Sequence, residues 1–107
     1  MTMREYQQAA LRTCRPLSDR DMLLNAAMGI CGESGEFIDA LKKHVYHDHA
    51  LDRERMLKEL GDVLWYVSLA AHALGSSMEE VARMNIDKLS ARYPEGFSVE
   101  GSHHQGE

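Results

Sequence analysis

Helical periodicity dominates the sequence. Only two prolines, Pro16 and Pro94, interrupt the 107 residues, and no segment alternates with the period of two that a half-buried strand requires. Between Leu23 and Val45, apolar residues recur so that, at about 100° per residue, they form one stripe along a helix. The sequence therefore predicts an all-α fold.

Capping signals divide the chain into four predicted helices. Thr2 and Ser77 each precede a glutamate by three residues, the capping-box pattern, and Ser18 and Asp52 are favourable N-cap residues. The helices are expected to end at Pro16, in the connection 44–50, at Gly75 and at 92–97. We expect one bundle-type domain over residues 1–97 and a polar, disordered tail over residues 98–107.

The third predicted helix indicates a partner chain. From Val63 to Leu74 it is apolar nearly all round, so this segment is expected to be buried on every side. A 107-residue chain with three other helices can hardly enclose it alone. We therefore predict a second subunit, and a homodimer at least. The expected inward positions of the fourth helix are Met78, Val81, Ala82, Ile86 and Leu89.

Two acidic pairs have i, i+3 spacing: Glu33 with Glu36, and Glu59 with Asp62. Each pair points to one side of a helix, and a short connection favours antiparallel neighbours, so four carboxylates can converge. Such a group of anions needs a cation, and an oxygen-only ligand set favours Mg²⁺, with Mn²⁺ as a substitute. Either pair alone would be read as a solvated acidic face, but apolar residues flank both pairs and favour the metal site.

Gly29, Gly32 and Gly35 lie inside the second predicted helix, where each costs roughly 1 kcal/mol relative to alanine. Gly61 lies inside the second acidic pair. Close approach of a helix or ligand explains such glycines, and a kink or break in the helix is the alternative.

Two other metal chemistries are disfavoured. A di-iron carboxylate bundle needs Glu-x-x-His, which neither acidic pair supplies. His44, His47 and His49 cluster in the predicted connection, where a solvated loop is favoured over a zinc site because no cysteine or second set of ligands lies nearby.

Side chains outside the acidic pairs are candidates for phosphate contacts. They are Lys43 near the end of the second helix, and Asn85, Lys88 and Arg92 near one face of the fourth. The alternative is an ordinary solvent-exposed helix surface.

Net charge disfavours some classes of binding partner, and cysteine usage bears on the cellular location. A net charge of −5 disfavours nonspecific binding to nucleic acid or to an anionic membrane. The apolar run is too short to span a bilayer. Cys14 and Cys31 fit no zinc spacing, and the chain starts without a signal-like segment, so we expect a reducing, cytoplasmic location.

The sequence motifs around the acids resemble those of the MazG-like all-α nucleoside triphosphate pyrophosphohydrolases. They are GESGE at 32–36, KELGDVLWY at 58–66 with 22 residues between the acidic pairs, and N-x-x-K-L-x-x-R-Y-P-x-G-F at 85–97. The four acids together with the second motif are a specific signal of this resemblance. The third motif supports it. The resemblance covers roughly residues 22–97.

The resemblance implies a helical bundle completed by dimerisation, with dimers often paired into tetramers. It implies an enzyme of the acid-anhydride hydrolase type, which cleaves nucleoside or deoxynucleoside triphosphates between the α- and β-phosphates to a monophosphate and pyrophosphate, in nucleotide-pool house-cleaning. Glu33 or Glu36 would orient or deprotonate the attacking water. The implied Mg²⁺ ligands are Glu33, Glu36, Glu59 and Asp62, and the implied phosphate contacts include Lys43, Lys88 and Arg92.

Two further functions stay open from the sequence. One is a helical dimerisation module without catalysis, suggested by the apolar run 63–74. The other is a regulator that binds a nucleotide without turnover. No residue indicates a preference for a base or a sugar.

Overall fold

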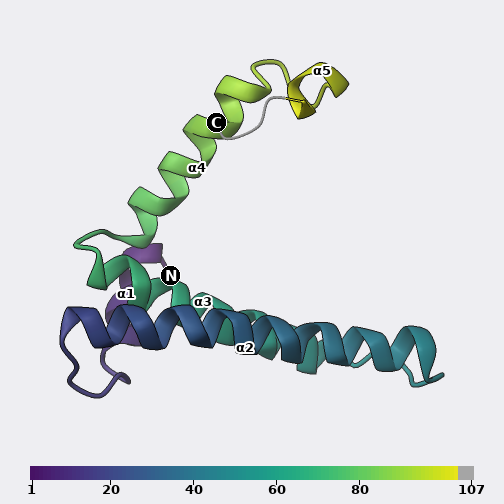
Figure 1. Ribbon diagram of the computed structural model, residues 1–107, viewed down its shortest axis with the longest axis horizontal. Helices are drawn as coiled ribbons and strands as arrows, with labels where there is room; N and C mark the ends of the chain where they lie inside the picture. The colour runs from purple at the N-terminus through teal and green to yellow at the C-terminus, as the bar shows by residue number, and fades with distance from the viewer. Residues whose placement is uncertain (104–107) are drawn as a thin grey trace.

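Five helices make up the computed structural model over residues 1–103, the part of the chain that the structure describes (Figure 1). They are α1 (Met3–Leu11), α2 (Asp19–Tyr46), α3 (Arg53–Ala73), α4 (Met78–Arg92) and α5 (Val99–Ser102). No strand forms within these residues, so the all-α prediction is confirmed. None of these helices combines the length and the apolarity that a bilayer crossing requires.

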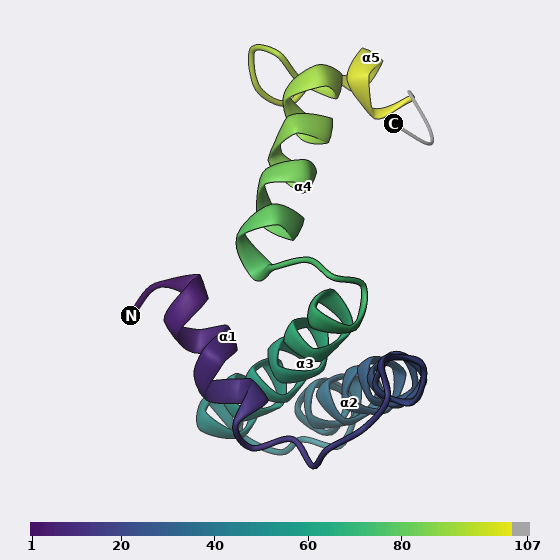
Figure 2. The same ribbon diagram turned by 90° about the vertical axis from the view of Figure 1, so that its left-hand side faces the viewer.

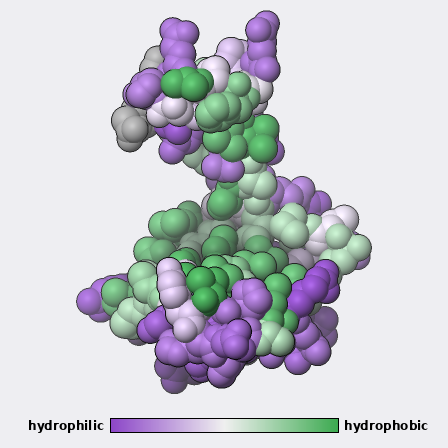
Figure 3. Space-filling model, turned by 90° about the vertical axis from the view of Figure 1, so that its right-hand side faces the viewer, coloured by the Kyte–Doolittle hydropathy of each residue, from purple (hydrophilic) through white to green (hydrophobic). Residues whose placement is uncertain are grey.

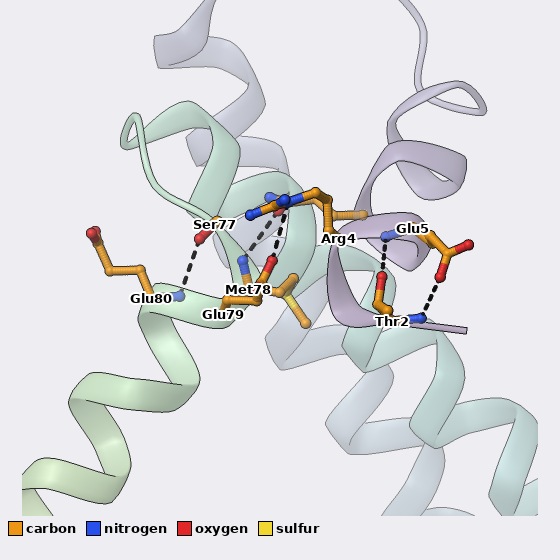
Figure 4. Close-up of polar contacts among 8 residues, drawn as sticks. Thr2, Arg4, Glu5, Ser77, Met78, Glu79 and Glu80 are labelled. Carbon is orange, nitrogen blue, oxygen red and sulfur yellow. Dashed lines mark hydrogen bonds and ion pairs between the residues drawn. The ribbon is translucent and has the colours of Figure 1, made fainter.

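Side-chain caps begin the first three helices where the sequence predicts. Thr2 and Glu5 form a complete capping box: Thr2 Oγ1 accepts from the Glu5 N–H at 3.0 Å, and Glu5 Oε1 accepts from the Thr2 N–H at 2.8 Å (Figure 4). Ser18 and Asp52 accept first-turn N–H groups at 3.1 and 3.0 Å. Each cap satisfies backbone donors that the helix itself leaves unpaired.

α2 and α3 run antiparallel and form the main packed pair, and α1 lies against the other side of α3 (Figures 1 and 2). The buried centre is formed by Met22, Ala26 and Leu69, with Trp65 and Tyr66 packed against it. The apolar run of α3 is therefore only partly enclosed by its own chain.

Polar contacts attach α1 to α3 and to the start of α4. The Trp65 indole Nε1 donates to Ala10 O at 3.2 Å and to Thr13 Oγ1 at 2.8 Å. Buried Gln7 donates from Nε2 to Ser68 O, and its Oε1 accepts from the Met78 N–H, both at 3.1 Å. Buried amide groups need such partners, so Gln7 joins three helices.

Gly29 is where α2 and α3 come closest among the helix glycines. A Cβ at Gly29 would collide with the Tyr66 ring, whereas nothing lies within 4 Å of the Cβ positions of Gly32, Gly35 and Gly61. Close approach of another helix of this chain thus explains Gly29 but not the other three. The alternative of a break is wrong, because α2 continues as one helix of 28 residues.

α4 leaves the α1–α3 bundle as an arm (Figure 1). Gly75, at φ +72°, turns the chain after α3, and Ser77 caps α4 by accepting the Glu80 N–H at 3.1 Å. The reverse half of the predicted capping box is missing, since Glu80 Oε1 accepts from Ser76 Oγ at 2.6 Å. The radius of gyration of 16.7 Å exceeds the roughly 13 Å expected of a compact chain of this length.

The predicted inward face of α4 is largely exposed within one chain. Met78 is buried, whereas Val81, Ala82, Ile86 and Leu89 are exposed in a single chain, because the turn directs α4 away from α2 and α3. Figure 3 shows the resulting apolar surface on the arm and on the bundle below it.

α5 corrects the expected tail. Residues 99–102 are helical and Gly101 is buried, where a Cβ would lie 2.6 Å from Arg92 O. The disorder predicted from residue 98 is therefore wrong for this segment, because it packs on the end of α4. The rings of Tyr93 and Phe97 stack beside it, with their centroids 5.7 Å apart. Residues 104–107 of the predicted tail lie outside the described part of the chain.

Candidate metal centre

Three of the four predicted acids meet between α2 and α3. Glu33, Glu59 and Asp62 each offer a carboxylate oxygen, and these oxygens lie within 4.8 Å of one another. Glu33 comes from the middle of α2, while Glu59 and Asp62 occupy the same side of α3 at i, i+3. It is the only such group of His, Cys, Asp or Glu side chains found in residues 1–103.

The Gly29–Tyr66 contact explains the register of α2 against α3, and therefore which acids lie opposite one another. Gly29 lies one helical turn before Glu33, and Tyr66 lies one turn after Asp62. In an antiparallel pair, seating the Tyr66 ring on Gly29 therefore brings Glu33 opposite Asp62. The glycine that the sequence singled out acts on the acids indirectly, through helix alignment.

The electrostatics of the cluster are unfavourable without a cation. A hydrogen bond shared with Glu59 raises the pKa of Glu33, and burial and the charges of Asp62, Glu59 and Glu36 raise this pKa further. The Glu59 side chain is only 16% exposed, and its Oε2 is buried without a hydrogen-bond partner. A buried carboxylate oxygen without a partner is costly.

The donor set fits a hard divalent cation. Three carboxylates supply oxygen ligands only, and the unpartnered Glu59 Oε2 is the kind of atom that a bound cation would satisfy. A surface pocket beside the cluster is lined by Asp52, Glu54, Arg55, Lys58, Glu59 and Asp62, so Glu59 and Asp62 are accessible from it. Mg²⁺ and Mn²⁺ both match this chemistry.

Glu36, the fourth predicted acid, lies outside the cluster. Its Oε2 is 3.6 Å from Nη2 of Arg55, and the same Nη2 lies 3.6 Å from Asp39 Oδ2. Arg55 Nε in turn lies 3.9 Å from Glu59 Oε1. The sequence interpretation missed Arg55 and Asp39; the available signals were i, i+4 spacing from Arg55 to Glu59 and i, i+3 spacing from Glu36 to Asp39.

Lys43 is paired within its own helix. Its Nζ lies 3.2 Å from Asp39 Oδ2, and this contact is the main cause of the lowered pKa of Asp39, to which Arg55 adds. Lys43 lines a shallow surface pocket together with Asp39, Lys42, His47 and His49.

The clustered histidines gather no metal-ligand set within residues 1–103. His44 Nδ1 instead lies 2.9 Å from His49 O, which joins the last turn of α2 to the connection after it.

The predicted α4 contacts lie on the arm. Asn85, Lys88 and Arg92 are carried away from the acids by the direction of α4 (Figure 1). Arg92 Nε is buried without a hydrogen-bond partner where α5 packs against α4. Within one chain, the structure brings Glu33, Glu59 and Asp62 together and leaves these three elsewhere.

Tyr6 is a neighbour of the cluster that the sequence did not indicate. Burial raises the pKa of its phenol, and the negative charge of Asp62 raises it further. The Tyr6 phenol of α1 is thus within electrostatic range of Asp62. A lone tyrosine in a short helix offers no sequence signal for this.

Comparison with known proteins agrees with the site. Residues 23–97 match the family model described as the MazG nucleotide pyrophosphohydrolase domain. "Gene 37 protein" of Mycobacterium phage L5 is 34% identical over 79 residues, which cover 70% of this chain and 68% of that protein. No solved structure matches. The matched segment contains all four acids, and the chain belongs to the MazG nucleotide pyrophosphohydrolase family.

Proposed function

We propose that this chain is a Mg²⁺-dependent hydrolase that cleaves nucleoside or deoxynucleoside triphosphates between the α- and β-phosphates, releasing a monophosphate and pyrophosphate. The observation that carries the proposal is the cluster of Glu33, Glu59 and Asp62, with its unpartnered Glu59 oxygen. Membership of the MazG family supports the same reaction type. House-cleaning of the nucleotide pool, in the cytoplasm, is the proposed role.

The acids would hold the metal and position the water. Glu33, Glu59 and Asp62 would supply ligands, and Glu36 would complete the set on leaving Arg55. Bound Mg²⁺ would neutralise triphosphate charge and act as a Lewis acid. Mn²⁺ should substitute, because it accepts the same oxygen ligands.

Water is the proposed nucleophile. Its oxygen forms the new bond to the α-phosphorus, the α–β bridging bond breaks, and the proton moves to a carboxylate. Glu33 suits this role because its carboxylate lies in the cluster, beside the place proposed for the metal and its water, and Glu36 is the alternative. No covalent intermediate is needed.

Phosphate contacts come from outside the cluster. We propose Lys43, Asn85, Lys88 and Arg92 for this role, and a homodimer or a pair of dimers in which the α4 arm of one chain approaches the acids of another. The exposed apolar residues of the arm support association.

The deciding experiment incubates the protein with each common and modified triphosphate plus Mg²⁺ and follows the products. Monophosphate and pyrophosphate should appear together, and the Glu59→Gln variant should lose at least about a hundredfold in rate. Glu79→Gln is the matched control, because Glu79 pairs with Arg4 at 3.4 Å at the start of α4, outside the cluster and its pocket. Orthophosphate as first product, or full activity of Glu36→Gln and Glu59→Gln, would contradict the proposal.

The open apolar surface also favours a second function, a helical dimerisation or nucleotide-binding module without turnover. Thermal unfolding separates these readings. A dimerisation module alone should gain no Mg²⁺-dependent stability from a nonhydrolysable triphosphate, whereas a regulator should gain stability but release no product.

A further inference from the structure

The guanidinium of Arg55 lies among three carboxylates from two helices. It faces Glu36 and Asp39 of α2 at 3.6 Å each and Glu59 of its own helix at 3.9 Å. Its side chain is 33% exposed, so the contacts are partly shielded from water. No other cation in residues 1–103 pairs with three acids.

Glu59 connects Arg55 to the metal cluster. Its Oε1 faces Arg55, while its Oε2 is buried and unpartnered. Glu36 differs, because it is 61% exposed and its only charged partner in the described residues is Arg55. The fourth predicted ligand is therefore held by a cation of the chain itself.

The contacts of Arg55 are weak enough for Glu36 to exchange Arg55 for a divalent cation. Distances of 3.6 to 3.9 Å exceed the range of a good N–H···O hydrogen bond, so the pairs are mainly electrostatic. Partly exposed pairs of this kind are weak individually. A divalent ion carries twice the charge of a guanidinium and can draw Glu36 away from it.

We propose that Arg55 is a positioning residue that holds Glu36 outside the cluster in the metal-free protein and releases it to a divalent cation. This inference rests on the proposed metal-dependent function. Arg55 supplies positive charge beside the acids while the cation is absent and competes with the cation for Glu36. Occupancy of the site is thus set by an exchange of partners at Glu36.

The exchange predicts that loss of Arg55 strengthens metal binding. We use Mn²⁺ alone as the probe and measure its dissociation constant by electron paramagnetic resonance. In Arg55→Gln, Glu36 is free and one positive charge is gone, so the dissociation constant should fall between about twofold and about tenfold. Arg55→Met, which keeps the aliphatic stem, should behave alike and guards against a defect peculiar to glutamine.

Arg53→Gln is the matched control. It removes the same charge from the same helix, at an exposed residue that does not line the pocket beside the cluster. Its dissociation constant should change by less than about twofold. Arg55→Lys keeps the charge and should stay near the wild-type value.

A double-mutant cycle tests the route through Glu36. Arg55→Gln should strengthen Mn²⁺ binding far less in a Glu36→Gln background, because no carboxylate remains to be released. Thermal unfolding gives a second readout. Arg55→Gln should lower the melting temperature without Mn²⁺ and gain more than wild type on saturation, whereas a structural role would lower both equally.

Unchanged or weaker Mn²⁺ binding by both Arg55→Gln and Arg55→Met would overturn the role of Arg55 while leaving the metal site intact. An Arg55 effect that persists undiminished in the Glu36→Gln background would overturn the exchange. Absence of Mn²⁺ binding by the wild-type protein would overturn both this inference and the proposed function.

Discussion

Glu33 is the residue in which the electrostatics of the cluster are most directly visible. The neighbouring Glu59 carboxyl, burial and the surrounding negative charges all favour the protonated form of Glu33. The pKa of Glu33 is therefore raised above its ordinary value of 4.5. A cation would reverse this preference by favouring the carboxylate.

The first prediction concerns pH and stability. Because the folded pKa of Glu33 is raised, the folded metal-free protein binds more protons than the unfolded chain between 4.5 and the folded pKa. The stabilisation is fully present below 4.5 and is lost as pH rises through the folded pKa. Urea unfolding from about pH 4 to about pH 7 should show wild type losing stability relative to Glu33→Gln.

Asp39 is the control of opposite sign. Lys43 and then Arg55 lower its pKa below 3.8, so its stabilisation is present above that value and is lost on acidification. Relative to Asp39→Asn, wild type should lose stability as pH falls below 3.8, so urea unfolding of this pair is extended down to about pH 2. If Glu33→Gln and wild type kept a constant difference across the range, a raised pKa of Glu33 would be excluded.

At the scale of the helices, packing at Gly29 sets the geometry on which the cluster depends. The Tyr66 ring occupies the space of a side chain at Gly29 and is itself packed edge-on against Trp65, with ring centroids 4.9 Å apart. The ring therefore has little room to retreat. A larger residue would separate α2 from α3 one turn from Glu33.

Gly29→Ala should accordingly lower the free energy of unfolding by about 1–3 kcal/mol, the typical cost of overpacking. Gly35→Ala should instead raise it by about 0.5–1 kcal/mol, because nothing lies within 4 Å of its Cβ position and alanine favours the helix. Chemical denaturation measures both changes. Equal effects would show that Gly29 has no special packing role.

Gln7 carries the other helix-level prediction. Gln7→Ala removes the partner of Ser68 O and leaves the buried Met78 N–H unpaired, at a cost of about 1–3 kcal/mol. Gln8→Ala, at an exposed position of the same helix, should change stability by less than about 0.5 kcal/mol. Hydrogen exchange at Met78 should speed up in Gln7→Ala alone if this amide depends on Gln7.

At the scale of the whole molecule, local signals in the sequence were sufficient for α1 to α4 and for three of the acids. Caps such as Thr2 and Asp52 act within one turn, and i, i+3 spacing aligns Glu59 with Asp62 without any tertiary contact. A short connection then brings α2 beside α3. These features depend on neighbours close in sequence.

Two kinds of feature could not be predicted from local sequence in the same way. They are the partner that a side chain contacts and the direction in which a turn sends the next helix. Glu36 could face either the cluster or a cation, and only the aligned helices show that Arg55 takes it. Periodicity identifies an apolar face on α4 but not the direction in which the turn at Gly75 sends it. The path of α4 is a property of the assembled chain, and it leaves apolar residues such as Leu89 in water.

The last prediction follows from that exposed face. Val81, Ile86 and Leu89 lie on one side of α4 and are 41%, 59% and 38% exposed, although α4 is joined to a well-packed bundle. Covering them with a second chain would bury apolar surface worth about 25 cal/mol per Å² before the costs of association. The protein should therefore be at least a dimer by light scattering at micromolar concentration.

Leu89→Glu should shift the protein toward the monomer, since a carboxylate cannot be buried there unpaired. Ala91→Glu adds the same charge at an exposed position about 160° around the helix from Leu89 and should leave the mass unchanged. A wild-type protein that is monomeric at this concentration, or two variants of equal mass, would contradict association through this face of α4.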